Sequence, residues 1–289
     1  MTDNPLEIIK LKNLKLAAKI ISGQLRNGIH LGRKTGSGSE FEQYRHYQPG
    51  DDPKRIDWKL FARSGKYQVK ESPVESQLEI KLMLDLSGSM NYIENGISRL
   101  DYAKNLLASL AYIGYQQGDI LSLYTLKNGQ VTVEVAPSIR SFQKIIYHLE
   151  SCVADGSWPT LHQPIPQLKS GNRELVIFVS DFFQKDQEWV EIVQQIQHPK
   201  KEIALFQILG QQEISFDQKG SFKFEDLESG NSVNLQGQEM QEKYNEAIQT
   251  YLLQLEASLL MPHVHLLGTT LHQPISQIIH QYLLNKGVN

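Results

Sequence analysis

The segment LEIKLMLDL at residues 78–86 constrains the fold more than any other part of the sequence. Its nearly continuous apolar character is typical of a central parallel strand covered by helices on both faces. The strand ends in polar residues, because Asp85 is followed by Ser87 and Ser89. A buried strand that presents a carboxylate and two hydroxyl groups at its carboxyl end predicts a binding site at that edge of the sheet.

The rest of the chain after this strand alternates between apolar runs and segments with helical periodicity. Such alternation predicts an α/β fold in three layers, with a mostly parallel central sheet between helices. The pair Asn128-Gly129 predicts a two-residue hairpin, so one strand of the sheet should be antiparallel. Strands are expected at 78–86, around the hairpin within 119–137, and at 174–181, 202–209 and 263–269; helices are expected at 98–117, 138–151, 187–197, 237–260 and 274–286.

Two of these helices allow more specific predictions. In the helix at 98–117 the apolar residues fall on one face, and Gly114 continues that stripe where a missing side chain would let the sheet come close. In the segment 138–151, the expected buried face includes Ile139 as well as Phe142.

The chain before residue 77 has a different character. Residues 1–30 are expected to be helical, whereas residues 31–75 are rich in Gly, charge and aromatics and are expected to form loops and short strands. We therefore divide the chain into an N-terminal extension, 1–76, and a main domain, 77–289, with a short-strand insertion at 211–236. The dense charges and aromatics within 45–63 could form an interaction surface, but we favour a hydrogen-bonded seam between the extension and the main domain.

Oxygen donors gather at the predicted carboxyl edge of the sheet. Asp181 ends a second apolar strand, and Thr160 stands in the loop-and-turn segment between the two strands. Gly88 between the serines would allow a tight turn. Mg²⁺ prefers six oxygen ligands, and hydroxyls are weak neutral ones. The predicted ligands, direct or through water, are Asp85, Ser87, Ser89, Thr160 and Asp181.

This pattern resembles the metal-ion-dependent adhesion site of von Willebrand factor A-like domains. The segments DLSGSM and VSD and the intervening Thr160 match that site. The segments GSGSEFEQYRHYQPGDDPKRIDWKLFARSGKYQVKE and FEDLESGNSVNL resemble the bacterial domain-of-unknown-function family 58. The resemblance implies a von Willebrand factor A-like (Rossmann-like) fold and a partner among the MoxR-type AAA+ ATPases, beside which members of that family are often encoded.

Our leading hypothesis is a metal-dependent protein-interaction module. It would bind one divalent cation, Mg²⁺ before Mn²⁺ or Ca²⁺, and dock an Asp or Glu of its partner, because two carboxylates leave the metal short of negative ligands. The alternative is a Mg²⁺-dependent phosphoester hydrolase that uses the same site, although no nucleophile or base stands out near the serines and DLSGSMN is not a G-x-S-x-G elbow. A further possibility is a serine-rich turn in which Asp85 only caps the following helix.

Composition and charge bear on the functional class and the cellular location of the protein. The net charge of −3 argues against a general nucleic-acid binder. Since the sequence has no run of 18 apolar residues, we expect no membrane span, and Lys residues interrupt the apolar positions of the first 20 residues, so we expect no signal peptide. One cysteine, Cys152, cannot form an internal disulfide, which fits a cytoplasmic location.

Overall fold

The chain folds into two units. The larger unit comprises Met1–Gly28 and Gln77–Asn289, and the smaller one comprises Ile29–Ser76. The division expected from the sequence placed all of residues 1–76 in an extension, whereas the structure groups the first 28 residues with the main domain. The structure, a computed structural model, describes residues 8–11, 13–30, 43–49, 51–71, 77–157, 165, 173–184, 188–216, 221–225, 227, 232–236 and 238–286.

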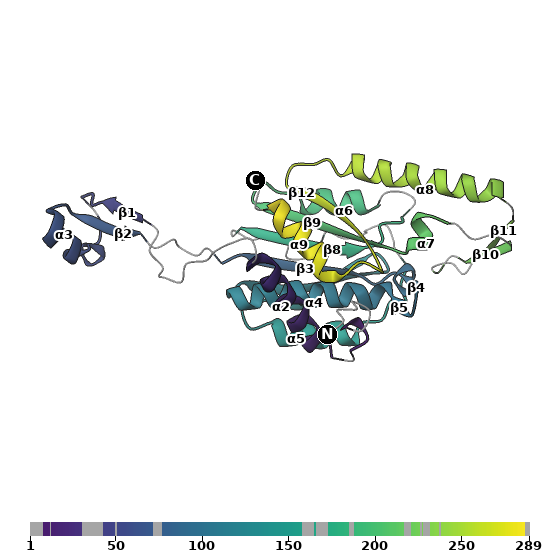
Figure 1. The fold of residues 1–289 in the computed structure, drawn as a ribbon, viewed down its shortest axis with the longest axis horizontal. Coiled ribbons are helices and arrows are strands. Elements are labelled where there is room, and N and C mark those ends of the chain that lie inside the picture. The colour runs from purple at the N-terminus through teal and green to yellow at the C-terminus, as the bar shows by residue number, and fades with distance from the viewer. Residues whose placement is uncertain are drawn as a thin grey trace. The chain divides into compact units, whose positions relative to one another are not determined.

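The larger unit is built on a six-stranded sheet with the strand order β12-β9-β8-β3-β6-β7 (Figure 1). All neighbouring pairs are parallel except β6 and β7, which are antiparallel. Asn128 and Gly129 connect these two strands with φ angles of 48° and 74°, so the predicted hairpin is confirmed. The strands are β3 (Glu79–Asp85), β6 (Ile120–Lys127), β7 (Gln130–Ser138), β8 (Glu174–Ser180), β9 (Lys201–Leu209) and β12 (Val264–Thr270).

Helices cover both faces of this sheet and create two apolar cores (Figure 1). All seven residues of β3 are buried, and their side chains alternate between the cores: Leu82 and Leu84 belong to one, Met83 to the other. The predicted mixed α/β fold in three layers is therefore confirmed. The first core includes residues of α2 (Leu14–His30), α4 (Arg99–Gln117), α5 (Phe142–Ser151) and α9 (Ile275–Lys286); the second includes residues of α6 (Glu188–Ile196) and α8 (Gln238–Ser258).

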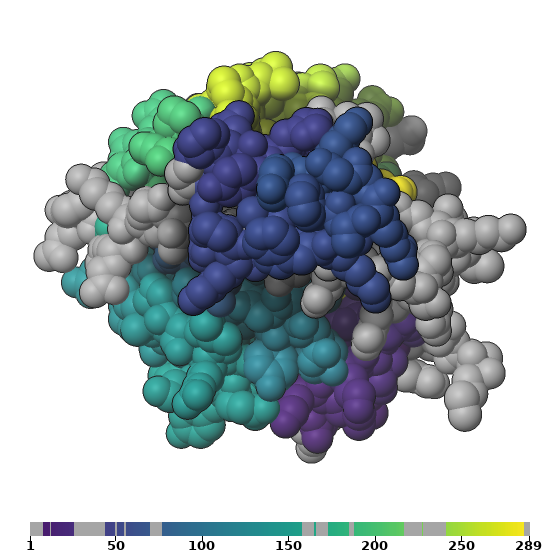
Figure 2. Space-filling view, turned by 90° about the vertical axis from the view of Figure 1, so that its left-hand side faces the viewer, coloured from purple at the N-terminus to yellow at the C-terminus, as the bar shows by residue number. Residues whose placement is uncertain are grey.

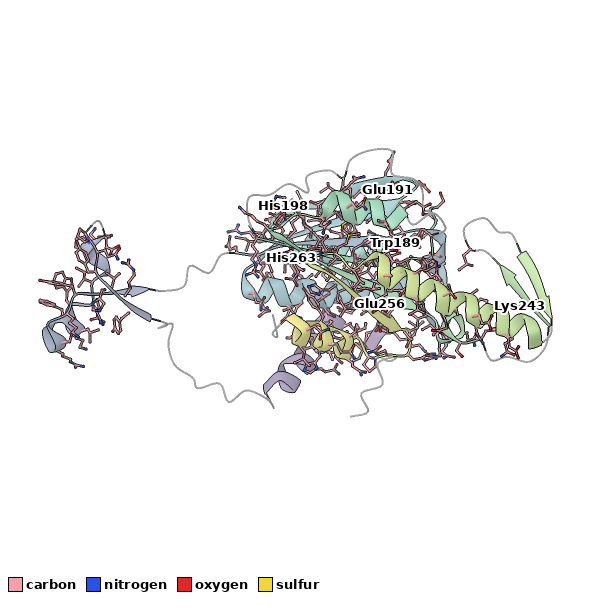
Figure 3. The ribbon with its side chains drawn as sticks, turned by 90° about the horizontal axis from the view of Figure 1, so that it is seen from above. Trp189, Glu191, His198, Lys243, Glu256 and His263 are labelled. Atoms are coloured by element: carbon pink, nitrogen blue, oxygen red, sulfur yellow. The ribbon has the colours of Figure 1, made fainter. Side chains whose placement is uncertain are left out.

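The second core is closed by α6 and by the long helix α8. Trp189 of α6 is fully buried in it. Figure 3 shows α8 from above, with Lys243 toward one end of the helix and Glu256 toward the other. His263 lies just before β12, outside the strand, with a φ of 64°.

Helix α4 has the expected buried face and the expected close approach to the sheet. Its apolar residues at helical spacing are buried, and Gly118 ends the helix in the left-handed conformation. A Cβ atom on Gly114 would lie 2.6 Å from Ile80 Cδ1 and 3.0 Å from Leu121 Cδ2. The prediction that this glycine lets α4 approach β3 and β6 is confirmed.

The start of α5 differs from the expectation. The helix begins at Phe142, and Ile139 is 44% exposed in the turn after β7, so its predicted place on the buried face is wrong. The physical reason lies in Ser141, whose single hydroxyl hydrogen is shared between the backbone carbonyls of Ser138 and Leu121, each 2.6 Å from Oγ. These bonds fix the chain against β6 before the first helical turn.

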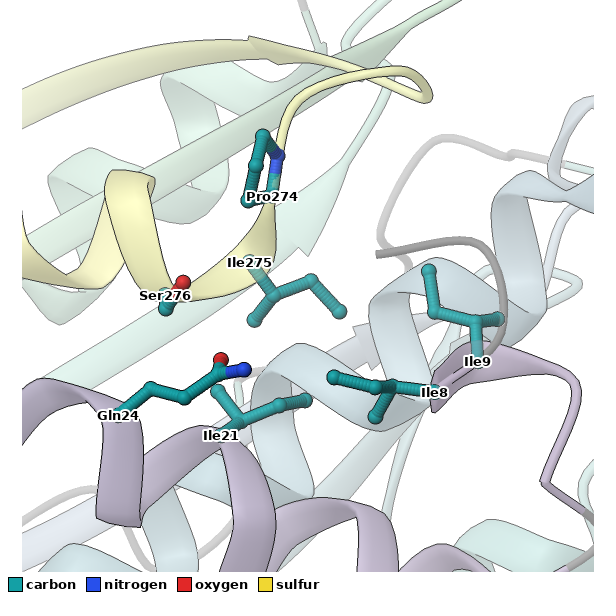
Figure 4. A pocket seen from close by; sticks show the side chains of 7 residues that line it. All are labelled: Ile8, Ile9, Ile21, Gln24, Pro274, Ile275 and Ser276. Atoms are coloured by element: carbon teal, nitrogen blue, oxygen red, sulfur yellow. The ribbon is translucent and has the colours of Figure 1, made fainter. Parts of the chain in front are cut away.

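Helix α2 belongs to the larger unit because it buries an apolar face there. It begins after Asn13, whose side-chain oxygen accepts a hydrogen bond from the Leu16 N–H at 2.9 Å. The hydroxyl of Ser22 donates to the carbonyl of Ser109 in α4 at 3.3 Å. Near the start of α9 a cavity of about 190 Å³ remains (Figure 4); it is lined by Ile8, Ile9, Ile21, Gln24, Pro274, Ile275 and Ser276.

The smaller unit contains a hairpin and a short helix, and its described residues form one body in the space-filling view (Figure 2). Strand β1 (Gln43–His46) pairs antiparallel with β2 (Gln68–Glu71). Between them lie the 3-10 helix η1 (Pro53–Arg55) and α3 (Trp58–Ser64), where the sequence predicted only loops and strands. That prediction is wrong because Asp57 caps the first turn of α3 and Gly65 ends the helix at a φ of 66°.

The charged residues of segment 45–63 make contacts inside the smaller unit. Arg45 forms a two-pronged ion pair with Asp51, with N–O distances of 3.0 and 2.9 Å. The hydroxyl of Tyr44 donates to Asp57 at 2.8 Å. These bonds hold β1 against the segment that connects it to β2. The seam to the main domain stays a prediction.

In its described residues, the insertion between β9 and α8 has a helix and two strands. Helix α7 (Gln211–Ile214) follows β9, and β10 (Ser221–Glu225) pairs antiparallel with β11 (Ser232–Gln236). The strands agree with the short strands expected within 211–236. Over the described part of the chain, none of the helices is both long and apolar enough to cross a membrane.

Candidate metal centre

Two carboxylates meet at the carboxyl edge of the sheet. Asp85 is the last residue of β3, and Asp181 directly follows the neighbouring parallel strand β8. Both side chains are fully buried. Asp85 accepts hydrogen bonds from the Ser87 backbone N–H at 2.8 Å and from the Ser180 hydroxyl at 2.7 Å. The structure thus brings together the two acids that the sequence placed at strand ends.

The two serine hydroxyls lie side by side above this edge. The Oγ atoms of Ser87 and Ser89 are 3.0 Å apart. Two adjacent ligands at right angles around Mg²⁺, each at about 2.1 Å from the ion, are themselves separated by about 3.0 Å. The 3-10 helix η2 (Gly88–Asn91) makes the turn that positions them, and the positive-φ glycines of the described chain do not include Gly88. Gly88 is thus part of a tight turn and adopts it without a positive φ.

Gly156, which precedes Thr160 in the sequence, lies alongside the serine turn. The Gly88 N–H donates to the Gly156 carbonyl at 2.6 Å, and the Gly156 N–H donates to the Leu86 carbonyl at 3.1 Å. A Cβ atom on Gly156 would lie 2.6 Å from Lys127 Cγ, so glycine permits this close approach. Thr160 itself, the fifth predicted ligand, lies outside the described residues.

A buried arginine that the sequence analysis did not single out completes the cluster. Arg99 is the first residue of α4 and is 1% exposed. Its Nη1 donates to Asp181 Oδ2 at 2.5 Å and to the Ser89 carbonyl at 2.8 Å. Its Nη2 donates to Glu213 of α7. The guanidinium also lies 5.0 Å from the centre of the Tyr92 ring.

Burial and neighbouring charge shift the protonation equilibria of these groups. Burial, with the nearby Asp181 charge, raises the pKa of Asp85 to about 7. Burial raises the pKa of Glu213, and the Arg99 guanidinium partly offsets that rise. For Arg99, burial alone would lower the pKa, but Asp181 and Glu213 outweigh it and raise the pKa. The protonation state of each group in the cluster therefore depends on the charges of its neighbours.

The donor set fits a small hard cation. The described candidates, Asp85, Ser87, Ser89 and Asp181, offer only oxygen atoms, which is what Mg²⁺ prefers. Asp181 and Glu213 are both paired with the Arg99 guanidinium, so Asp85 is the acid of this cluster that has no ion pair among the described residues. No group of three or more His, Cys, Asp or Glu side chains suited to a metal occurs in the part of the chain that the structure describes. A cation here would therefore depend on the hydroxyls as well as the acids.

Comparison with known proteins supplies a family and a set of similar structures. A model of the family described as "Protein of unknown function DUF58" matches residues 43–251. An uncharacterized protein of Mycobacterium tuberculosis is 25% identical over 233 residues, covering 79% of this chain and 73% of that protein. The conserved hypothetical protein BatB from Bacteroides thetaiotaomicron is 14% identical with a TM-score of 0.46, over 73% of this chain and 100% of that one. The SpRpn10 VWA domain is 11% identical with a TM-score of 0.43, over 71% of this chain and 95% of that one.

Proposed function

The chain belongs to the DUF58 family of proteins of unknown function, and from this premise we propose that it is a metal-dependent protein-interaction module. Its larger unit has the mostly parallel sheet covered by helices that is expected of a von Willebrand factor A-like domain, and a role in protein interaction agrees with such a fold. In the proposal, Mg²⁺ binds at the ends of β3 and β8 and docks an Asp or Glu side chain of a partner protein.

The observation that supports this proposal most strongly is the serine pair beside the buried acids. The 3.0 Å separation of the Ser87 and Ser89 hydroxyls suits two adjacent ligands of an octahedral ion. Asp85 would supply the negative ligand, directly or through water, with Asp181 and Thr160 completing the protein's contribution. When bound, the cation would act as the Lewis acid that attracts a carboxylate oxygen.

The need for a foreign carboxylate follows from the charges that the site already holds. Asp181 is paired with Arg99 and is therefore partly neutralised. Hydroxyl ligands add no negative charge. A divalent ion bound by Asp85 and two serines would retain positive charge, and a partner's Asp or Glu is the group that neutralises it. By family resemblance, we propose that the partner is a MoxR-type AAA+ ATPase acting in chaperone-like assembly.

Calorimetric titration of Mn²⁺ and Mg²⁺ tests the metal assignment. We expect wild type to bind one ion and Asp85→Ala to bind it roughly 100-fold more weakly, because the unpaired negative ligand is lost. Asp119→Asn is the matched control: Asp119 is also a buried acid, but it precedes β6 at the opposite end of the strand and accepts from the Leu78 N–H. Equal affinity in wild type and Asp85→Ala would contradict the assignment.

The docking role is tested by capture of the ATPase from the native host. The purified wild-type protein should retain the MoxR-type ATPase in Mg²⁺ and release it in EDTA, and Asp85→Ala should not retain it. Capture that is independent of metal would contradict the proposal. Turnover of generic phosphoester substrates that disappears in Asp85→Ala would instead indicate the hydrolase that the sequence left open.

A further inference from the structure

We propose that Arg99 makes cation binding at the strand ends depend on an incoming carboxylate. The inference rests on the proposed function, because it concerns the same metal centre. In this view Arg99 is a built-in positive charge that weakens the site for a cation alone. The same charge strengthens the loaded site for an acidic partner side chain.

The position of Arg99 is unfavourable except for its carboxylate partners. It is the first residue of α4, directly after the N-cap Ser98, and a cation at a helix N-terminus opposes the helix dipole. A buried guanidinium also requires compensating charge. Asp181 and Glu213 supply that charge on its two Nη atoms. The arginine is therefore held at the site by acids on two other elements.

The arrangement of these charges is asymmetric with respect to the candidate ligands. Arg99 contacts Asp181 and the Ser89 carbonyl directly, so its charge lies next to the proposed ligands. Glu213 accepts from the other Nη atom, not the one that contacts Ser89 and Asp181, and it also accepts from the Gly210 N–H at 2.6 Å. For a cation at the serines, the repulsion by Arg99 should therefore be stronger than the attraction by Glu213.

A donor of Arg99 is also still available. Its Nε–H is buried and has no hydrogen-bond partner among the residues that the structure describes. A purely structural arginine in a buried network would be expected to use all its donors. An oxygen atom from water or from an incoming carboxylate would satisfy this group. The unused donor thus agrees with a role in receiving an acidic ligand.

Two consequences follow from this arrangement. Removing the Arg99 charge should strengthen cation binding, whereas removing the Glu213 charge should weaken it. A carboxylate that neutralises the positive charge at the site should raise cation affinity, and the cation should raise carboxylate affinity by the same factor. Without Arg99 this mutual enhancement should become smaller.

The test is a titration of Mn²⁺ followed by the electron paramagnetic resonance signal of the free ion, with and without acetate as the probe carboxylate. We expect Arg99→Gln to bind Mn²⁺ roughly tenfold more tightly than wild type and Glu213→Gln to bind it about threefold more weakly. Acetate should raise the wild-type affinity roughly fivefold and the Arg99→Gln affinity less than twofold. Arg99→Lys, which keeps the charge, should stay close to wild type.

The opposite directions separate this role from a merely structural one. Arg99→Gln and Glu213→Gln break the same ion pair. If that pair were only a structural bridge, its loss would therefore shift Mn²⁺ affinity in the same direction in both variants. If Arg99→Gln fails to fold, as judged by circular dichroism, Glu213→Gln decides, and unchanged or tighter Mn²⁺ binding by it overturns the inference. If wild type binds no Mn²⁺, the proposed function fails together with this inference. If wild type binds Mn²⁺ and Asp85→Ala does not, but Arg99→Gln binds the ion no more tightly than wild type, only this inference fails.

Discussion

At the scale of single residues, Asp85 is the group whose state most affects the site. Its side chain is fully buried, and burial together with Asp181 raises its pKa to about 7. The ordinary value of the aspartate pKa is near 3.8. Between these two values the folded protein keeps a proton that the unfolded chain has lost.

A pH dependence of stability follows for the metal-free protein. Because folding takes up a proton in this window, the stabilisation is complete below about pH 4 and is lost as the pH rises to about 7. In EDTA, the free energy of unfolding in urea should therefore include a contribution from Asp85 that falls by at most about 1.4 kcal/mol for each pH unit. Asp85→Asn, which cannot ionise, should lack this contribution. The same pH slope in both proteins would contradict the raised pKa.

The residues of the site differ in how far the sequence could predict them. Asp85 and Asp181 could be placed together because parallel strands end at one edge of the sheet. Arg99 and Glu213 could not, because their pairing joins positions 114 residues apart through the tertiary fold. One local signal was nevertheless available: Arg99 follows the N-cap Ser98, where a positive charge is unfavourable without a nearby acid.

At the scale of elements, the contact of α4 with the sheet is set by the absence of a side chain. Gly114→Ala should destabilise the protein by about 1–2 kcal/mol, because overpacking against Ile80 and Leu121 outweighs the gain in helix propensity. Urea unfolding of the variant measures the loss. Ile80→Val removes the Cδ1 atom that lies 2.6 Å from the added methyl, so the double variant should lose less than the sum of the two single variants. Strict additivity would contradict the predicted contact.

Element types were predictable where the apolar pattern was long and regular, as in β3 and α4. The short helix α3 was missed because only seven residues separate its cap from its end, too few for a periodic pattern. The sequence nevertheless contains a signal for each end of α3, the capping residue Asp57 and the terminating Gly65. Ile139 was misplaced because Ser141 makes tertiary hydrogen bonds to β6, which no local pattern shows.

At the scale of the whole molecule, the family match spans both units. It covers residues 43–251, which include the hairpin and α3 of the smaller unit as well as the strand ends of the larger one. The described candidate ligands all lie in the larger unit. The mostly parallel character of the sheet was predictable from the alternation of strands and helices, whereas the placement of α2 depended on tertiary burial of Ala17, Ala18 and Ile21.

The central claim is that one divalent cation binds between the ends of β3 and β8. The most direct measurement is an anomalous difference map from a crystal of the wild-type protein grown in millimolar Mn²⁺. The account predicts a peak within bonding distance of the Ser87 and Ser89 hydroxyls, and no such peak in Asp85→Ala. A wild-type map with no peak at these serines, in crystals that contain Mn²⁺, would contradict the account.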